Sequence, residues 1–241
     1  MGLPSANTQT SAARLWLLPL IAGLLPAAAA VAAFRISVAY EIFASCNPFI
    51  DGCVSISRAG RYGAANHVFR ALMVPAAILQ AITWLLCTSW LLRLGATGRS
   101  LKWLPWLGLA AGGFLVVYGT FIGTEGHVYQ LLRRYGVMIY FGCTYLCMLV
   151  TASLVHQRVK TGAIKLPARA DVALLALLAA NLLMGLAQVF AAPLLLDAET
   201  RDRVEDAVEW YAGASFTVFF CALAWLWKRT TFRASFHTGN L

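Results

Sequence analysis

The feature that most constrains this chain is a series of six long apolar stretches separated by short polar segments. A transmembrane helix needs roughly 20 largely apolar residues to cross a hydrocarbon core of about 30 Å, so six helices nearly use up the 241 residues. Backbone that faces lipid must satisfy its own hydrogen bonds, so each stretch is expected to be helical. The sequence therefore predicts an all-α, polytopic transmembrane bundle of about six helices, at residues 16–36, 68–92, 104–122, 137–156, 172–192 and 212–227.

Composition supports this class, since 60% of the residues are hydrophobic and 12% charged, and the mean hydropathy is +0.71. The expected organisation is an N-terminal tail at 1–15, a transmembrane domain at 16–227 with an external loop at 37–67, and a C-terminal tail at 228–241. The first stretch, with Arg14 before an apolar run and then small residues, also resembles a cleavable signal peptide. Because the run continues to Ile36, a retained span is favoured.

Charge distribution predicts the orientation, because Lys and Arg accumulate in cytoplasmic loops. A cytoplasmic N-terminus places eleven of the 19 Lys and Arg residues inside with one acid, and eight outside with nine of the ten acids. Both termini are therefore expected in the cytoplasm, and loop 37–67 outside. The cations are scattered among apolar segments instead of forming one basic face, so no nucleic-acid partner is predicted despite the net charge of +9. The Ala-rich, Lys-poor composition indicates a bacterial inner (plasma) membrane.

Cys46 and Cys53 lie in the external loop, whereas the other cysteines fall inside predicted helices. The pair is seven positions apart, and a turn containing Pro48 and Gly52 can close that separation to disulfide distance. A disulfide is the structural interpretation. Metal ligation by the two thiolates is the alternative, although a closed metal site needs more ligands than this loop clearly offers.

Arginines and serines follow the cysteines on the same side of the membrane. Arg70 lies just inside the second predicted helix, where an arginine either extends to water or binds an anion such as a lipid phosphate. Arg58 and Arg61 precede it, and Ser55 and Ser57 supply hydroxyl donors between them. This group is the predicted site for a phosphate-bearing headgroup.

Three further titratable residues are expected at the same interface. Glu125 and His127 follow the third predicted helix, and Glu209 precedes the last one. A carboxylate beside an imidazole sets the ring tautomer and raises its basicity, as a general base requires. The alternative is that all three are ordinary solvated residues at a membrane boundary.

Polar residues at mid-depth are sparse, which argues against a proton pump or an ion-coupled transporter. The clearest ones are Gln80, Asn181 and Gln188. No phosphate-binding Gly-rich loop, nucleophile elbow or His-Glu-x-x-His pair is found. Because His156 and His237 belong to the cytoplasmic side, haem held between mid-membrane histidines is disfavoured, and no cofactor is predicted.

Several of these residues together resemble a known family. The Val-Ser-Ile-Ser run ending at Ser57, the Phe69-Arg70 pair, His127, and Glu209-Trp210-Tyr211 are similar in order to motifs of the FRAG/DRAM/SFK group, which includes the post-GPI-attachment lipid-remodelling factors. The resemblance implies a six-helix membrane protein whose external histidine and aromatic-Glu signature act on lipid, with Trp210 in the binding site. The sequence departs from the family at Val54, where members typically have a proline.

Three hypotheses follow. In the first, the external cluster engages a lipid or lipid-linked headgroup and supports acyl remodelling, with His127 as base, Glu125 or Glu209 orienting it and Arg70 holding phosphate. In the second, the protein is a non-catalytic scaffold that binds lipid, a membrane-protein partner or a second copy of itself. The third is a metal-dependent membrane enzyme in which His67, His127 and a nearby carboxylate bind zinc.

Overall fold

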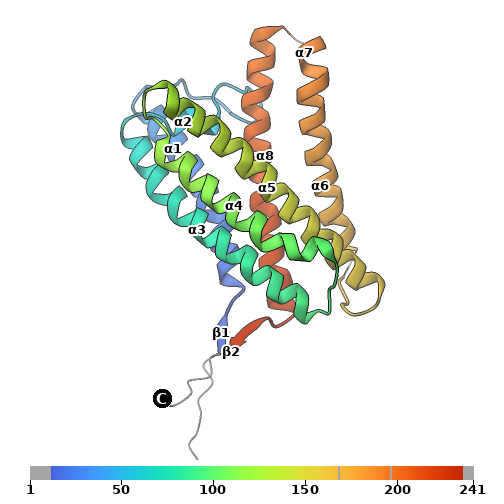
Figure 1. Ribbon diagram of the computed structural model, residues 1–241. Helices are drawn as coiled ribbons and strands as arrows, with labels where there is room; N and C mark the ends of the chain where they lie inside the picture. The colour runs from blue at the N-terminus through green and yellow to red at the C-terminus, as the bar shows by residue number, and fades with distance from the viewer. Residues whose placement is uncertain (1–11, 168, 196, 236–241) are drawn as a thin grey trace, which may run out of the picture.

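The computed structural model describes residues 12–167, 169–195 and 197–235 (Figure 1). Among these residues, six helical segments are long and apolar enough to cross a membrane, which confirms the predicted fold class and is what an integral membrane protein requires. The elements are β1 (Ala12–Arg14), α1 (Leu17–Ala39), α2 (Ile56–Ala59), α3 (Gly63–Arg93), α4 (Arg99–Phe121), α5 (His127–Lys160), α6 (Ala170–Leu186), the π-helical turn η1 (Ala187–Ala191), α7 (Ala192–Leu195), α8 (Ala198–Arg229) and β2 (Arg233–Ser235).

The two ends of the described chain lie on the same side of the bundle. Strands β1 and β2 pair antiparallel there, with Arg14 opposite Arg233 (Figure 1). An even number of crossings produces this arrangement. The predicted tails, at 1–15 and 228–241, lie partly outside the described residues, and His237 lies wholly outside them.

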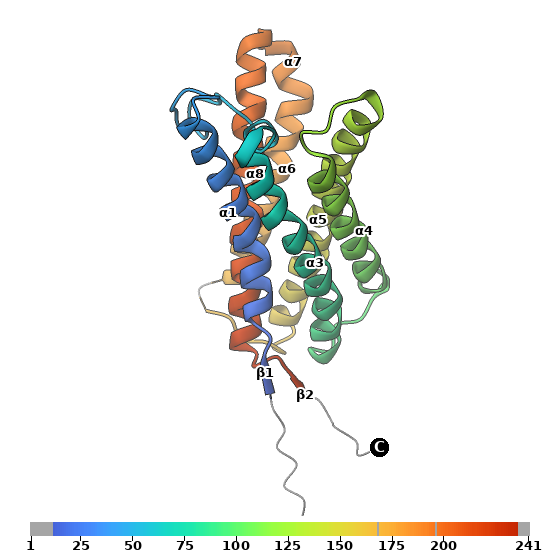
Figure 2. The same cartoon turned by 90° about the vertical axis from the view of Figure 1, so that its left-hand side faces the viewer.

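Helices α1, α3, α4, α5 and α8 contribute to a common core, and Figure 2 shows α1, α3 and α4 side by side. Helix α6 packs at the periphery against α5 and α8 (Figure 1). Small residues let the helices approach closely. A Cβ on Gly108 of α4 would lie 2.2 Å from the Cβ of Trp84 on α3, and one on Gly23 of α1 would lie 2.4 Å from the Cβ of Phe220 on α8. These contacts follow the rule that small residues drive helix packing in membranes.

Two helices begin ten or more residues earlier than the apolar stretches indicate. Helix α5 starts at His127 instead of 137, and α8 starts at Ala198 instead of 212, so most of the polar segments at 124–135 and 197–209 is helical. Hydropathy detects the part of a helix that faces lipid, whereas hydrogen bonding and capping set where it begins. Asp197 supplies the cap of α8, because its side chain accepts a hydrogen bond of 2.9 Å from the Thr200 backbone N–H.

Candidate functional site

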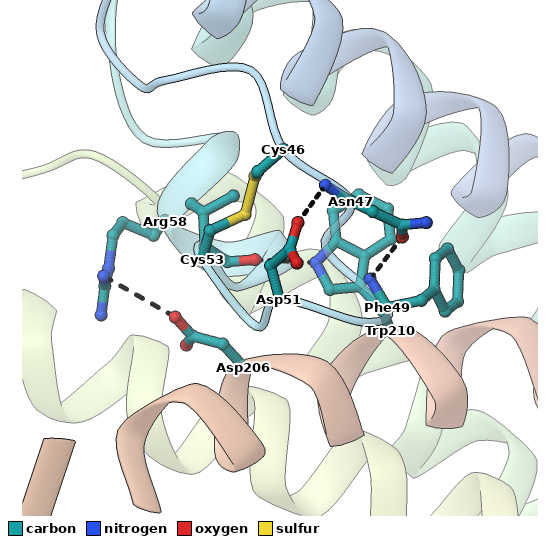
Figure 3. The surroundings of a disulfide bond; sticks show 9 residues. Cys46, Asn47, Phe49, Asp51, Cys53, Arg58, Asp206 and Trp210 are labelled. Carbon is teal, nitrogen blue, oxygen red and sulfur yellow. Dashed lines mark hydrogen bonds and ion pairs between the residues drawn. A yellow bond between two sulfur atoms is a disulfide. The ribbon is translucent and has the colours of Figure 1, made fainter. Parts of the chain in front are cut away.

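The loop between α1 and α3 is held in a compact form by its own side chains (Figure 3). The sulfur atoms of Cys46 and Cys53 are within bonding distance and their Cα atoms are 6.7 Å apart, as the disulfide interpretation predicts. Inside the closed ring, the Asp51 carboxylate accepts a hydrogen bond of 2.7 Å from the Asn47 backbone N–H. The Asn47 side-chain oxygen in turn accepts from the Phe49 backbone N–H at 3.1 Å.

This disulfide loop rests directly on the outer part of α8. The indole Nε1 of Trp210 donates a hydrogen bond of 2.8 Å to the carbonyl of Val54, and both residues are buried. The Phe49 ring lies 5.6 Å from that of Trp210, and Figure 3 shows the two side by side. Gly52 has φ +56°, and a Cβ there would lie 1.9 Å from the carbonyl oxygen of Arg203, so a side chain at this position would force the loop off the helix.

Helix α2 places Ser55, Ser57 and Arg58 against the same part of α8. Ser55 begins the helix, and its hydroxyl accepts a hydrogen bond from the Arg58 backbone N–H at 3.2 Å. The Glu209 carboxylate accepts a hydrogen bond from the Ser57 backbone N–H at 3.2 Å. The Arg58 guanidinium forms an ion pair of 3.7 Å with Asp206, which partly neutralises its charge (Figure 3).

Beneath this loop, an apolar cavity of about 120 Å³ extends into the bundle. Phe49, Ile56, Glu209 and Trp210 line its outer part, and residues of α1, α3, α4, α5 and α8 form the rest of the wall. Helix α6 contributes none of its lining residues. The cavity is therefore suited to a hydrocarbon group.

Two arginines that form no ion pair among the described residues, Arg61 and Arg133, lie near the part of this cavity that Glu209 lines, and Glu209 is within electrostatic reach of Arg61. The Nε of Arg61 is buried and has no hydrogen-bond partner within the described part of the chain. Arg133, on α5, lies close enough to Arg61 for their like charges to interact, and its side chain donates a hydrogen bond to the Thr124 carbonyl at 3.3 Å. Tyr118 lies within electrostatic reach of Arg61, Arg133 and Glu209, and its buried hydroxyl also lacks a partner.

Buried groups of this kind usually find hydrogen-bond partners, and two nearby guanidinium groups repel each other unless an anion lies between them. An anionic headgroup at this point would satisfy both requirements. The predicted arginines differ in this respect, because Arg58 forms an ion pair with Asp206, whereas Arg61 forms no ion pair among the described residues and has Glu209 only within electrostatic reach. Arg70 is half-buried and forms no ion pair within the described part of the chain.

The three residues that the sequence suggests for catalysis do not contact one another through hydrogen bonds among the described residues. Glu209 lines the cavity, whereas the side chains of Glu125 and His127 are exposed, and among the described residues neither one hydrogen-bonds to Glu209. His67 is also exposed. No group of three His, Cys, Asp or Glu side chains in the described ranges is placed to hold a metal ion, so the metal-enzyme hypothesis gains no support.

Two residues of this site were not among the sequence candidates. In the charge count Arg133 is one of the eight cations expected outside, and Tyr118 falls within the apolar stretch at 104–122. The sequence feature that could have indicated Arg133 is the Arg133-Arg134 pair near the N-terminal end of α5. The sequence does not show which of the two side chains faces the interior of the bundle. Tyr118 gave no signal, because an aromatic residue near a helix end is ordinary at a membrane interface.

The chain matches no family model, and comparisons with characterised proteins and with solved structures find no similar protein. Function is therefore argued from the site itself.

Proposed function

We propose that this protein binds a membrane amphiphile, with a hydrocarbon chain in the cavity and an anionic headgroup such as phosphate at Arg61, Arg133 and Tyr118. The observation that carries the proposal is that the apolar cavity lies next to the polar groups of Arg61, Arg133 and Tyr118. An apolar cavity extends from Glu209 and Trp210 into the bundle, and unpartnered cationic and hydroxyl groups lie near its outer part. Arginine binds phosphate through several directed donors, and a tyrosine hydroxyl adds a neutral one.

The size of the cavity limits what enters it. An engineered apolar protein cavity of about 150 Å³ binds one benzene molecule, so about 120 Å³ encloses a short stretch of a single slender chain and excludes a fused ring system or two chains side by side. A second acyl chain of a phospholipid would remain in the bilayer. The proposed ligand is thus an anionic lipid of which one chain is buried.

Binding of decyl phosphate to the purified full-length protein in detergent, measured by isothermal titration calorimetry, tests the proposal. Arg61→Gln and Arg133→Gln are each expected to weaken binding about tenfold or more, because each removes a charge-assisted hydrogen bond to the headgroup. Arg134→Gln is the matched control, since Arg134 is exposed and adjacent in sequence. Equal losses for the Arg133 and Arg134 variants would contradict the headgroup assignment.

A second pair of variants tests the chain-binding part. Ala27 lines the cavity, whereas its neighbour Ala28 is exposed on the other face of α1. Ala27→Leu is expected to fill the cavity and abolish binding, and Ala28→Leu to leave it unchanged. Undiminished binding by a folded Ala27→Leu protein would rule out the cavity as the binding site.

Acyl remodelling, which the resemblance to the FRAG/DRAM/SFK group implies, adds a chemical step to the same binding mode. Incubating the protein with phosphatidylglycerol vesicles and following fatty-acid release separates the two. Release that depends on His127 would support remodelling. Binding without release would leave a lipid-binding protein, in agreement with the lack of contact between His127 and Glu209.

A further inference from the structure

The inner part of the cavity contains one polar group whose hydrogen-bonding capacity is unfilled. Gln80, on α3, is 2% exposed and lines the cavity. Its Nε2 donates a hydrogen bond of 3.1 Å to the carbonyl of Ala22 on α1. That bond fixes the orientation of the amide, because a carbonyl can only accept, and it leaves Oε1 as a buried acceptor with no partner among the residues that the structure describes.

Neighbouring side chains leave this acceptor unfilled. Tyr140 lines the same cavity from α5, and its hydroxyl lies within hydrogen-bonding reach of the Gln80 amide and of Thr144, although Gln80 Oε1 accepts no hydrogen bond from it. Thr217, on α8, also faces the cavity, but its hydroxyl is already bonded to the carbonyls of Gly213 at 3.0 Å and Gly23 at 3.3 Å. A buried acceptor in a membrane interior is costly, so a donor is expected to reach Gln80.

The depth of Gln80 can be estimated from its neighbours. Gln80 bonds to Ala22, and the next residue of α1, Gly23, bonds to Thr217, so Gln80 lies at about the level of Thr217. Thr217 is eight residues beyond Glu209 on α8, which corresponds to about 12 Å along the helix. A chain that starts at the headgroup site would therefore have to extend about 12 Å to reach Gln80.

We infer that the bound ligand carries a hydroxyl at the buried end of its hydrocarbon chain, which donates a hydrogen bond to Gln80 Oε1. The inference rests on the proposed function and specifies its ligand. The ligand is an anionic amphiphile that inserts one hydrocarbon chain into the cavity, and that chain carries a hydroxyl. The hydroxyl is neutral, as the surroundings require, since the inner lining residues Gln80, Tyr140 and Thr217 carry no charge. An ionised chain end would have no counterion there.

The test compares three ligands that differ only at the chain end, namely decyl phosphate, its ω-hydroxy derivative and its ω-methoxy derivative. The full-length protein is expected to bind the ω-hydroxy compound roughly two- to tenfold more tightly than decyl phosphate, as one buried hydrogen bond provides. The ω-methoxy compound can accept but cannot donate, so it should bind no better than decyl phosphate. A gain for both derivatives would indicate a general preference for polar chain ends and overturn the inference.

Three variants test whether Gln80 is the residue that causes the preference for the ω-hydroxy ligand. In Gln80→Met the ratio between the ω-hydroxy and unmodified ligands should fall to about one, because a thioether is a poor acceptor. Thr217→Val, which removes a hydroxyl that already has partners, and Tyr140→Phe should both retain the wild-type ratio. Retention of the ratio in Gln80→Met, or loss of it in Tyr140→Phe, would overturn the assignment to Gln80.

The outcomes separate this inference from the proposed function. If decyl phosphate and the ω-hydroxy ligand bind equally well, the proposed function stands and the inference fails. A tightly held water that already donates to Gln80 Oε1 would give this result. If neither ligand binds, the proposed function fails and the inference fails with it.

Discussion

Substitution of Trp210 by phenylalanine should release the disulfide loop from α8. Trp210 is 4% exposed, its Nε1 donates to the Val54 carbonyl at 2.8 Å, and its ring packs edge-on against Phe34 with 5.9 Å between centroids. Phenylalanine keeps an aromatic ring but removes the donor, so the buried Val54 carbonyl is left unpaired, at a cost of about 1–3 kcal/mol. The smaller ring adds about 1 kcal/mol through the gap it leaves.

The expected total is about 2–4 kcal/mol, which for a chain of this size lowers the midpoint of thermal unfolding by roughly 4–16 °C. Thermal unfolding of the purified protein measures the shift, and Trp106→Phe is the matched control, because Trp106 is 66% exposed and should change stability by no more than about 0.5 kcal/mol. Hydrogen exchange should also increase within residues 46–60. Equal shifts in the two variants would refute the role given to the Trp210 hydrogen bond.

Two further predictions concern helix packing and topology. Gly108→Ala places a methyl against the Trp84 Cβ and should lower stability by about 1–3 kcal/mol, whereas Gly113→Ala, which points into open space, should be neutral or stabilising in the same thermal unfolding assay. In intact cells, a membrane-impermeant maleimide should label Cys46 and Cys53 after reduction and leave them unlabelled before it, as counted by mass spectrometry. Labelling without reduction would contradict the disulfide, and no labelling under either condition would contradict the external placement of the loop.

The apolar stretches predicted the existence and order of the spanning helices, because in lipid a long apolar run has no alternative to a helix. They did not predict where α5 and α8 begin. His127 and Ala198 begin helical turns that carry charged and polar residues beyond the apolar part of each helix. The first turn of α8 is capped by the Asp197 side chain, whereas the first turn of α5 has no side-chain cap, and hydropathy indicates neither start.

The candidate site was predicted in part. The sequence identified Arg61, Glu209 and Trp210 as residues at one interface, since the order of the helices alone brings them to the same end. It gave no basis for separating Arg61 from Arg58, which differ because Asp206 faces one of them and not the other. It also grouped His127 with Glu209, although their side chains have different surroundings.

By itself, the sequence determined that this chain forms a bundle of apolar helices with a cysteine-containing loop at one end, because length, hydropathy and the need to pair backbone groups admit few other solutions. The tertiary structure decided which polar groups face the interior. Arg133 and Tyr118 join Arg61 through the rotation of α5 and α4 about their axes, and Gln80 presents a free acceptor because its amide is fixed by Ala22 on another helix. Helix rotation and contacts between distant segments depend on the packing of all the helices at once, and so no local pattern in the sequence specifies them.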